Sequence, residues 1–265
     1  MSDARIRLLD LSIGLVEDVR RGDGHPDSGF SPDFQIALPY RGLFLWHVGS
    51  DEIVGDPNQL IFVRGGESYR LTTRGFAELI VTPRLEVLSE IAGGCLFEHP
   101  LFRRRTWRAD PQLQSFRTRF LHWARTPERD PLAAEELVLQ LLRSAFQHDA
   151  RRERPTGTTT ARLIRRTKEV LQSQLSKRVL LTDVARTVGA SPAYLTDLFT
   201  RTEGASLHQY LTQLRLARAL VELPHTDDLT ALALDLGFSS HSHFTYAFRR
   251  GFGCTPSQFR ESTRA

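Results

Sequence analysis

One pattern is written twice between Leu181 and Phe259, and this duplication constrains the fold more than any other feature of the chain. The first copy reads LTDVARTVGASPAYLTDLFTRTEGASLHQYL, and the second reads LTALALDLGFSSHSHFTYAFRRGFGCTPSQF. Matching positions lie 48 residues apart at first (181 to 229) and 49 apart after one inserted residue (191 to 240). The matched pairs include Leu181 and Leu229, Ala185 and Ala233, Gly189 and Gly237, Ser191 and Ser240, Leu195 and Phe244, Phe199 and Phe248, Gly204 and Gly253, and Tyr210 and Phe259. Each copy is therefore predicted to form one structural unit.

Each copy has the spacing of a helix-turn-helix. In the first copy, the small side chain of Ala185 allows a second helix to cross closely, and Gly189 supplies the left-handed backbone of a tight turn. Ser191 and Pro192 then supply an N-cap and a proline in the first helical turn, so a second helix is expected to begin there. Asp228 is placed to cap the first helix of the second copy.

A single long helix is predicted to join the two copies. Residues 206–220 carry an apolar stripe at helical spacing, and Pro224 ends it. The stripe consists of Leu207, Tyr210, Leu211, Leu214, Ala217 and Leu220. Two helix-turn-helix units on one rigid strut can place their second helices in successive turns of the DNA major groove, about 34 Å apart. One chain could then contact a site that other regulators contact as dimers.

The segment from about residue 160 to 260 resembles the DNA-binding domain of AraC/XylS-type bacterial transcription regulators. The second copy carries most of the family signature, with Gly237, Phe238, Phe244, Phe248 and Gly253 in place, followed by Pro256. The resemblance implies a sequence-specific DNA-binding transcription regulator with promoter DNA as its partner. It also implies activation, through RNA polymerase, as the usual mode.

The residues expected to contact DNA face away from the core on the second helix of each copy. The expected base-facing residues are Ala193, Thr196, Asp197, Thr200, His241, Ser242, Thr245 and Tyr246. The expected phosphate contacts are Ser191, Arg201, Ser240, Arg249 and Arg250. Tyr194 is expected at the margin of the core. Where the family commonly has a DNA-contacting arginine, this chain has Asp197 and Tyr246. Asp197 either accepts a hydrogen bond from a cytosine amino group, orients a neighbouring side chain, or only caps or pairs locally with Arg201. Tyr246 either donates a hydrogen bond to a phosphate or packs on a thymine methyl group.

The first half of the chain is predicted to form short antiparallel strands. Apolar segments at 34–38, 42–48, 60–63, 68–73 and 77–81 alternate with turn residues, which favours a small barrel or sandwich. This half resembles the cupin-type sensor domain found at the amino end of AraC-type regulators. The fold class is therefore α+β with two domains: a cupin-like antiparallel barrel with trailing helices, and an all-α domain of two helix-turn-helix units joined by a linker helix.

The barrel lacks the residues of a cupin enzyme. Such an enzyme needs a His-x-His pair and further ligands, but only His47 lies on a predicted strand and Tyr69 stands where the later histidine is expected. His241 and His243 point to different sides of a helix and do not suggest a metal site. No catalytic residue, metal or cofactor is therefore expected.

A small-molecule effector is expected to bind in the mouth of the barrel, although the same aromatic residues could form only a core. An inward arginine would favour an anionic effector. The expected pocket consists of Phe34, Phe44, Trp46, Phe62, Arg64, Tyr69 and Arg70.

Two helices are predicted at 110–124 and 131–148. The second has an apolar stripe that must pack on the barrel or on a second subunit, and a homodimer is expected on this ground. The segment 151–160, RRERPTGTTT, has the composition of a linker. The expected divisions are a sensor barrel at 1–105, a helical dimerisation segment at 106–150, the linker, and a DNA-binding domain at 161–265.

Charge and composition agree with this organisation. The chain has a net charge of +4, and its segment from Thr156 onward holds 14 Lys/Arg against 9 Asp/Glu, so the basic excess lies with the duplicated pattern. The absence of a long apolar run, together with the charged first residues, predicts a cytoplasmic protein without a membrane partner. Its two cysteines are too few for a disulfide framework. A ligand-independent dimeric regulator and a cupin enzyme fused to a DNA-binding module stay as alternatives.

Overall fold

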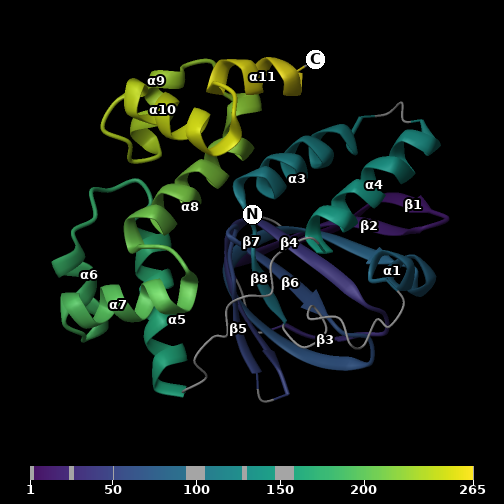
Figure 1. Cartoon of the computed structure of the whole chain (residues 1–265), viewed down its shortest axis with the longest axis horizontal. Coiled ribbons are helices and arrows are strands. Elements are labelled where there is room, and N and C mark those ends of the chain that lie inside the picture. The colour runs from purple at the N-terminus through teal and green to yellow at the C-terminus, as the bar shows by residue number, and fades with distance from the viewer. Residues whose placement is uncertain are drawn as a thin grey trace. The chain divides into compact units, whose positions relative to one another are not determined.

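The computed structural model describes residues 3–23, 27–49, 51–93, 105–126, 130–146 and 158–264. The chain divides into two compact units, Met1–Ala150 and Arg151–Ala265. The first contains a β-sheet with helices, and the second is entirely helical where it is described (Figure 1). This confirms the α+β, two-domain fold class. None of the helices in the described ranges has the length and apolar character needed to span a membrane.

The first unit is built on a curved antiparallel sheet of eight strands (Figure 1). The strands are β1 (Ala4–Leu11), β2 (Gly14–Asp23), β3 (Asp27–Ser31), β4 (Gln35–Val48), β5 (Asp51–Gly55), β6 (Gln59–Val63), β7 (Glu67–Pro83) and β8 (Thr106–Arg108). Their order is β1-β2-β7-β4-β6-β8, with β3 also paired to β7 and β5 to β4. The sheet therefore continues three residues past the expected boundary at 105.

Two pairs of predicted strands are each one long strand. The segments 34–38 and 42–48 fall on β4, apart from residue 34, which lies just before it, and 68–73 and 77–81 belong to β7. The predicted turns between them are bulges, because the register shifts there while the strands stay paired. Gly42 and Gly75 have φ of 78° and 88°, and a Cβ on Gly42 would lie 2.0 Å from the Gly75 carbonyl oxygen. The glycines thus permit a close approach of two continuous strands, and the interpretation of these positions as turns is corrected.

The two faces of the sheet have different surroundings. One face, here called the Trp46 face, holds a buried cluster that includes Phe44, Trp46, Ile61 and Ile80. Phe62, between Ile61 and Val63, points to the other face and packs edge-on against Phe146 with ring centroids 6.3 Å apart. Successive residues of a strand alternate between faces, so this division follows directly from the strand geometry.

Three helices accompany the sheet: α1 (Leu85–Ile91), α3 (Pro111–Trp123) and α4 (Pro131–Phe146). The predicted helices at 110–124 and 131–148 correspond to α3 and α4, with residues 147 and 148 outside the described ranges. Asp110 caps α3 by accepting a hydrogen bond from the Leu113 amide at 2.7 Å. The apolar stripe of α4 is buried against α3, α1 and β1. A second subunit is not needed to cover that stripe, which removes the reason for expecting a dimer.

The second unit contains the duplicated pattern as two helix-turn-helix copies. Its helices are α5 (Thr158–Ser173), α6 (Leu181–Val188), α7 (Pro192–Glu203), α8 (Leu207–Glu222), α9 (Leu229–Asp235), α10 (His241–Phe252) and α11 (Pro256–Arg264), with a short 3₁₀ turn, η2 (Leu223–His225), before α9. The first copy is α6 and α7, and the second is α9 and α10. Gly189 and Gly237 have φ of 75° and 80°, as the predicted turns require. The helix α5 begins inside the segment that was expected to be the linker.

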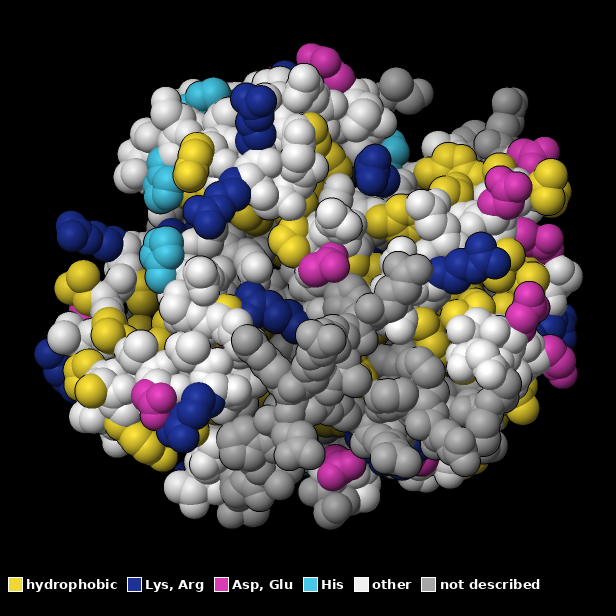
Figure 2. All heavy atoms as spheres, in the orientation of Figure 1, with side chains coloured by type: hydrophobic (Ala, Val, Ile, Leu, Met, Phe, Trp, Pro, Cys, Tyr) yellow, Lys and Arg dark blue, Asp and Glu magenta, His cyan; other side chains and the backbone are white. Residues whose placement is uncertain are grey.

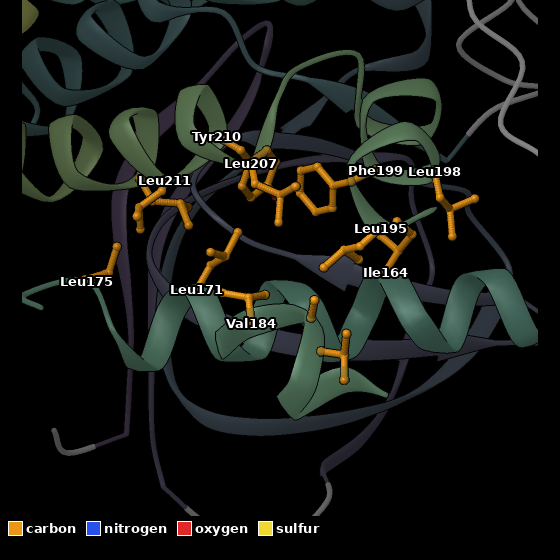
Figure 3. Packing of buried hydrophobic residues seen from close by; sticks show 13 residues of the cluster. Ile164, Leu171, Leu175, Val184, Leu195, Leu198, Phe199, Leu207, Tyr210 and Leu211 are labelled. Carbon is orange, nitrogen blue, oxygen red and sulfur yellow. The ribbon is translucent and has the colours of Figure 1, made fainter. Parts of the chain in front are cut away.

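Each copy has its own core, and α8 contributes to both. The core of the first copy gathers side chains from α5, α6, α7 and the first half of α8 (Figure 3). The core of the second copy gathers residues of α9, α10 and α11 with Leu216, Ala219 and Leu220 of α8. Because one continuous helix is buried in both cores, the two copies cannot turn independently without exposing apolar surface. The predicted role of residues 206–220 as a strut is thus supported by the packing.

A buried arginine links the two copies directly. Arg215 of α8 donates from Nε to the Leu175 carbonyl oxygen at 2.9 Å and from Nη2 to the Lys177 carbonyl oxygen at 2.7 Å, both just beyond α5. The same guanidinium lies 5.9 Å from the ring centroid of Phe238, in the second copy. Gly237 lies against this group, because a Cβ there would be 2.5 Å from the Leu175 carbonyl oxygen. These contacts among Leu175, Lys177, Arg215, Gly237 and Phe238 are called the Arg215 bridge below.

A second buried charge ties α5 to α7. Lys168 Nζ and Glu203 Oε2 lie 3.1 Å apart, with side chains only 3% and 2% exposed. The ammonium also lies 5.2 Å from the ring centroid of Tyr210. The net stabilisation from a buried ion pair of this kind is small, because desolvation offsets much of the attraction.

Replacing each of the two equivalent turn glycines by alanine tests how much the close packing at the Arg215 bridge contributes to the stability of the second unit. Both Gly189→Ala and Gly237→Ala force alanine into a left-handed backbone, at about 1–2 kcal/mol. Only the alanine at Gly237 also meets the Leu175 carbonyl, since no atom lies within 4 Å of a Cβ on Gly189. We therefore expect Gly237→Ala to lower the free energy of unfolding by ~1–3 kcal/mol more than Gly189→Ala does.

The measurement is urea unfolding of the full chain followed by far-ultraviolet circular dichroism. The three tryptophans, Trp46, Trp107 and Trp123, lie in the first unit, so tryptophan fluorescence reports that unit separately. Equal losses of stability in the two variants would show that the bridge does not constrain the second copy.

The pH dependence of the first unit is expected to depend on Glu78. This residue pairs with Val19 on the Trp46 face, and its Oε2 atom is buried without a hydrogen-bond partner. Burial raises the pKa of Glu78 to about 8, against the opposing charges of Arg21 and Arg5. The native carboxyl therefore keeps its proton between pH 4.5 and about 8 while the unfolded one loses it, so the stabilising contribution is lost as pH rises through this window.

Glu78→Gln should remove this dependence. Relative to the unaltered chain, we expect the variant to gain stability on the order of a few kcal/mol as pH rises through that window. Urea unfolding followed by tryptophan fluorescence at both ends of the window measures this gain. Glu86→Gln, at an exposed position on α1, serves as the control and should follow the unaltered chain. Parallel pH profiles for Glu78→Gln and the unaltered chain would contradict the assignment.

Candidate nucleic-acid interface

Serine caps fix the start of the second helix in each copy. Ser191 accepts a hydrogen bond from the Tyr194 amide at 3.3 Å, and Ser240 accepts one from the His243 amide at 3.1 Å. The predicted cap at Ser191 is thereby confirmed, and the cap at Ser240 is its equivalent in the second copy. Each serine acts only as an acceptor in its cap, so its hydroxyl hydrogen is available to a phosphate oxygen. The phosphate contacts of Ser191 and Ser240 themselves stay a prediction.

The outer face of α7 presents the residues expected to contact bases in the first copy. Leu195, Leu198 and Phe199 are buried, which orients the opposite side of the helix outward. On that side Ala193, Asp197 and Thr200 are exposed, while Thr196 is half-buried and donates from Oγ1 to the Pro192 carbonyl at 2.9 Å.

The outer face of α10 is arranged in the same way. Phe244 and Phe248 are buried. His241, Ser242 and Tyr246 are exposed, with Tyr246 at 66%. Thr245 is half-buried, with its Oγ1 3.5 Å from Nε2 of His241. All eight expected base-facing residues thus lie on the sides of α7 and α10 that are turned away from the two cores, and their contacts with DNA stay a prediction.

Tyr194 is placed differently from the expectation. It is 51% exposed and belongs to the outer face of α7, not to the margin of the core. Its equivalent in the second copy is His243, whose ring packs edge-on against Phe238 at 5.4 Å. The N-cap at Ser191 fixes where α7 begins and therefore which residues share a face of the helix. Residue 194 lies about one turn before the exposed Asp197, so this spacing could have predicted that Tyr194 is exposed.

The two outer faces differ in charge. On α7, Arg201 Nη2 and Asp197 Oδ2 lie 2.6 Å apart, and both side chains are more than half exposed. This is the local pairing that the sequence left as one alternative for Asp197. On α10, Arg249 and Arg250 are exposed in the last turn, and this fully described helix contains no acidic residue. Figure 2 shows histidine and basic side chains close together in the region of α10. The second copy therefore offers more uncompensated positive charge to phosphates than the first.

The expected effector pocket does not form one group of residues. Phe44 and Trp46 are buried on the Trp46 face, where Tyr69 packs against Trp46 at 6.0 Å. Phe62 lies on the opposite face with Phe34 and Phe146. Arg64 is half-buried and Arg70 is exposed. The predicted grouping is corrected because strand alternation sends neighbouring positions to different faces.

Polar residues that the sequence did not single out lie on the Trp46 face. Arg5 donates from Nη2 to Glu17 Oε2 at 2.6 Å, and this pair neighbours the buried carboxyl of Glu78. The segment ARIRLLDLSIGLVEDVRRG carries an alternation of charged and apolar residues that could have predicted β1 and β2. These strands are missing from the prediction because the many charged residues obscure the apolar alternation.

The uncompensated arginines of α10 generate a prediction about salt dependence. Arg250→Ala should weaken binding to every DNA sequence by a similar factor and reduce the slope of log affinity against log salt by ~1. Fluorescence anisotropy with a labelled duplex over a series of salt concentrations measures both. Arg186→Ala is the matched control, since Arg186 is exposed on α6 but paired with Asp183 at 3.1 Å. An unchanged slope in Arg250→Ala would exclude a phosphate contact there.

Comparisons with known proteins agree with the geometry of the second unit. A family model described as a helix-turn-helix domain matches residues 184–262, which span both copies. The HTH-type transcriptional activator RhaR of Klebsiella pneumoniae is 29% identical over 143 residues, which cover 54% of this chain and 51% of RhaR. The Transposon Tn10 TetD protein of Escherichia coli is 34% identical over 93 residues, which cover 35% of this chain and 67% of TetD.

A solved transcriptional regulator from Chromobacterium violaceum, described as having an AraC-type DNA-binding domain, is 27% identical with a TM-score of 0.38. It covers 40% of this chain, which in turn covers 96% of it. The chain spans about half the length of RhaR. The range matched by the family model lies over the duplicated pattern. This chain belongs to the AraC/XylS-type family of helix-turn-helix regulators.

Proposed function

We propose that the chain is a sequence-specific DNA-binding transcription regulator. The observation that carries the proposal is the pair of exposed outer faces on α7 and α10, both built on α8. Each face has short polar side chains able to reach base edges, and arginines follow near the end of each helix. This arrangement suits entry of α7 and α10 into successive turns of the major groove.

The contacts with DNA divide into two kinds. Arg249 and Arg250 and the capping serines contact phosphates and set the register of the protein on the duplex. The residues on the outer faces of α7 and α10 contact base edges and supply sequence preference. The basic excess of the second unit strengthens association with any DNA and makes it dependent on salt.

The first unit binds a small-molecule effector and adjusts how the second unit engages DNA. The Trp46 face supports this proposal, because it combines aromatic side chains with the polar group of Arg5, Glu17 and Glu78. An effector that binds one arrangement of the two units better than another shifts the population toward it. As an activator, the chain would then contact RNA polymerase at a promoter.

Selection of genomic fragments with the full-length protein tests the DNA-binding function. Footprinting and a salt titration on the best fragment follow. The expected result is protection of about two helical turns per protomer, roughly 20 base pairs. Affinity should fall by about 10³ or more between low and physiological salt if six or more phosphates are contacted. Protection that never localises would contradict sequence-specific binding.

Thermal-shift screening of the full chain against metabolite libraries tests the effector. Tryptophan fluorescence reports the first unit, so a true effector should raise its unfolding temperature. Glu78→Gln should reduce that shift if the ligand binds on the Trp46 face. A shift that is unaltered in Glu78→Gln would place the ligand elsewhere.

A further inference from the structure

The first and second copies differ at one equivalent position of their outer faces. The 49-residue offset places Asp197 and Arg201 of α7 opposite Tyr246 and Arg250 of α10. Asp197 is an exposed carboxylate on a surface that would otherwise be neutral or basic, and it is held by Arg201 at 2.6 Å. Tyr246 is exposed and uncharged. The two copies have the same arrangement of helices. At the position expected to contact base edges, however, the first copy has a carboxylate and the second has a phenol.

A carboxylate at this position restricts what α7 can approach. Phosphate oxygens repel Asp197, so contact with the DNA backbone through this residue is unfavourable. Hydrogen-bond donors in the major groove are limited to the exocyclic amino groups of cytosine and adenine. Adenine presents its N7 acceptor beside that amino group, whereas cytosine presents no second acceptor from its own ring. The carboxylate is therefore complementary to cytosine.

Arg201 pairs with this carboxylate on the exposed surface of α7. It lies four residues after Asp197, and the pair spans one turn of α7. A guanidinium has five N–H donors, so Arg201 can hold Asp197 with one and donate others to a phosphate. The ion pair offsets the repulsion between Asp197 and the DNA without occupying both carboxylate oxygens. Arg201 is thus a positioning residue for Asp197.

We propose that Asp197 selects cytosine at one base pair of the subsite contacted by α7, while Tyr246 at the equivalent position of α10 imposes no such requirement. This inference rests on the proposed DNA-binding function and names the base that one residue recognises. The first copy then acts mainly as a selector. The second copy, with Arg249 and Arg250 uncompensated among the residues described, acts mainly as the phosphate anchor.

Selection from a randomised DNA pool tests the proposal and does not require a known operator sequence. The full-length protein and its Asp197→Ala and Tyr246→Ala variants are each used, and circular dichroism verifies that both exposed substitutions leave the fold intact. In the unaltered protein, we expect one cytosine-enriched position in one of the two subsites. That enrichment should disappear in Asp197→Ala and persist in Tyr246→Ala.

Titration of the selected duplex measures the strength of the preference. Replacing the C·G pair by T·A substitutes an acceptor for the amino donor and should weaken binding of the unaltered protein about tenfold or more. The same replacement should change binding by Asp197→Ala by less than about twofold. Arg201→Ala should reduce the discrimination, and Arg201→Lys should restore it, because a lysine at this position can also pair with the carboxylate.

The outcomes separate this inference from the proposed function. Cytosine enrichment that survives Asp197→Ala, or localised binding with no enriched cytosine in the α7 subsite, would overturn the inference and leave DNA recognition intact. Failure of the unaltered protein to enrich any sequence would overturn the proposed function and the inference together.

Discussion

The position of the second copy relative to the first depends on the Arg215 bridge. A guanidinium is costly to bury, and burial lowers the pKa of Arg215, yet the group stays charged because arginine is protonated throughout the physiological range. Its cost is offset by two carbonyl oxygens, of Leu175 and Lys177, and by the ring of Phe238. The carbonyls follow α5, whereas the ring belongs to the second copy. A hydrophobic contact would tolerate sliding, whereas directed hydrogen bonds to carbonyls fix one arrangement.

The helix packing and caps that the two copies share explain how their outer faces can differ while the fold of each copy stays the same. The helix α8 is buried in both cores, and the caps at Ser191 and Ser240 set the phase of α7 and α10. Residues that serve the frame are therefore constrained by packing and hydrogen bonding. Asp197 and Tyr246 contact neither core, so they are free to carry different chemistry. Specificity can thus change at these positions without loss of stability.

The sequence predicts the second unit well because its signals are local. Caps, turn glycines and apolar spacing each act within a few residues, and the duplication repeats them. The sheet is predicted less well, because Gly42 and Gly75 mark bulges between paired strands and no local signal distinguishes a bulge from a turn. The residues predicted to form one effector pocket do not all lie together, because Phe62 lies on the opposite face of the sheet from Trp46. The Arg215 bridge escapes prediction, since its carbonyl partners lie 38 and 40 residues away in the chain.

The packing of α8 in both cores holds α7 and α10 at a fixed separation, and we propose that the two helices contact one duplex together. Insertion of about five base pairs between the two subsites of a selected fragment tests it most directly, because half a helical turn moves one subsite to the opposite face of the DNA. The rigid frame predicts at least a tenfold loss of affinity and a footprint reduced to one subsite. Inserting five more base pairs returns the two subsites to the same face of the DNA but leaves them about 34 Å further apart than in the original fragment. The affinity should therefore not recover. Affinity that is unchanged by these insertions would contradict the frame and indicate two independently tethered copies.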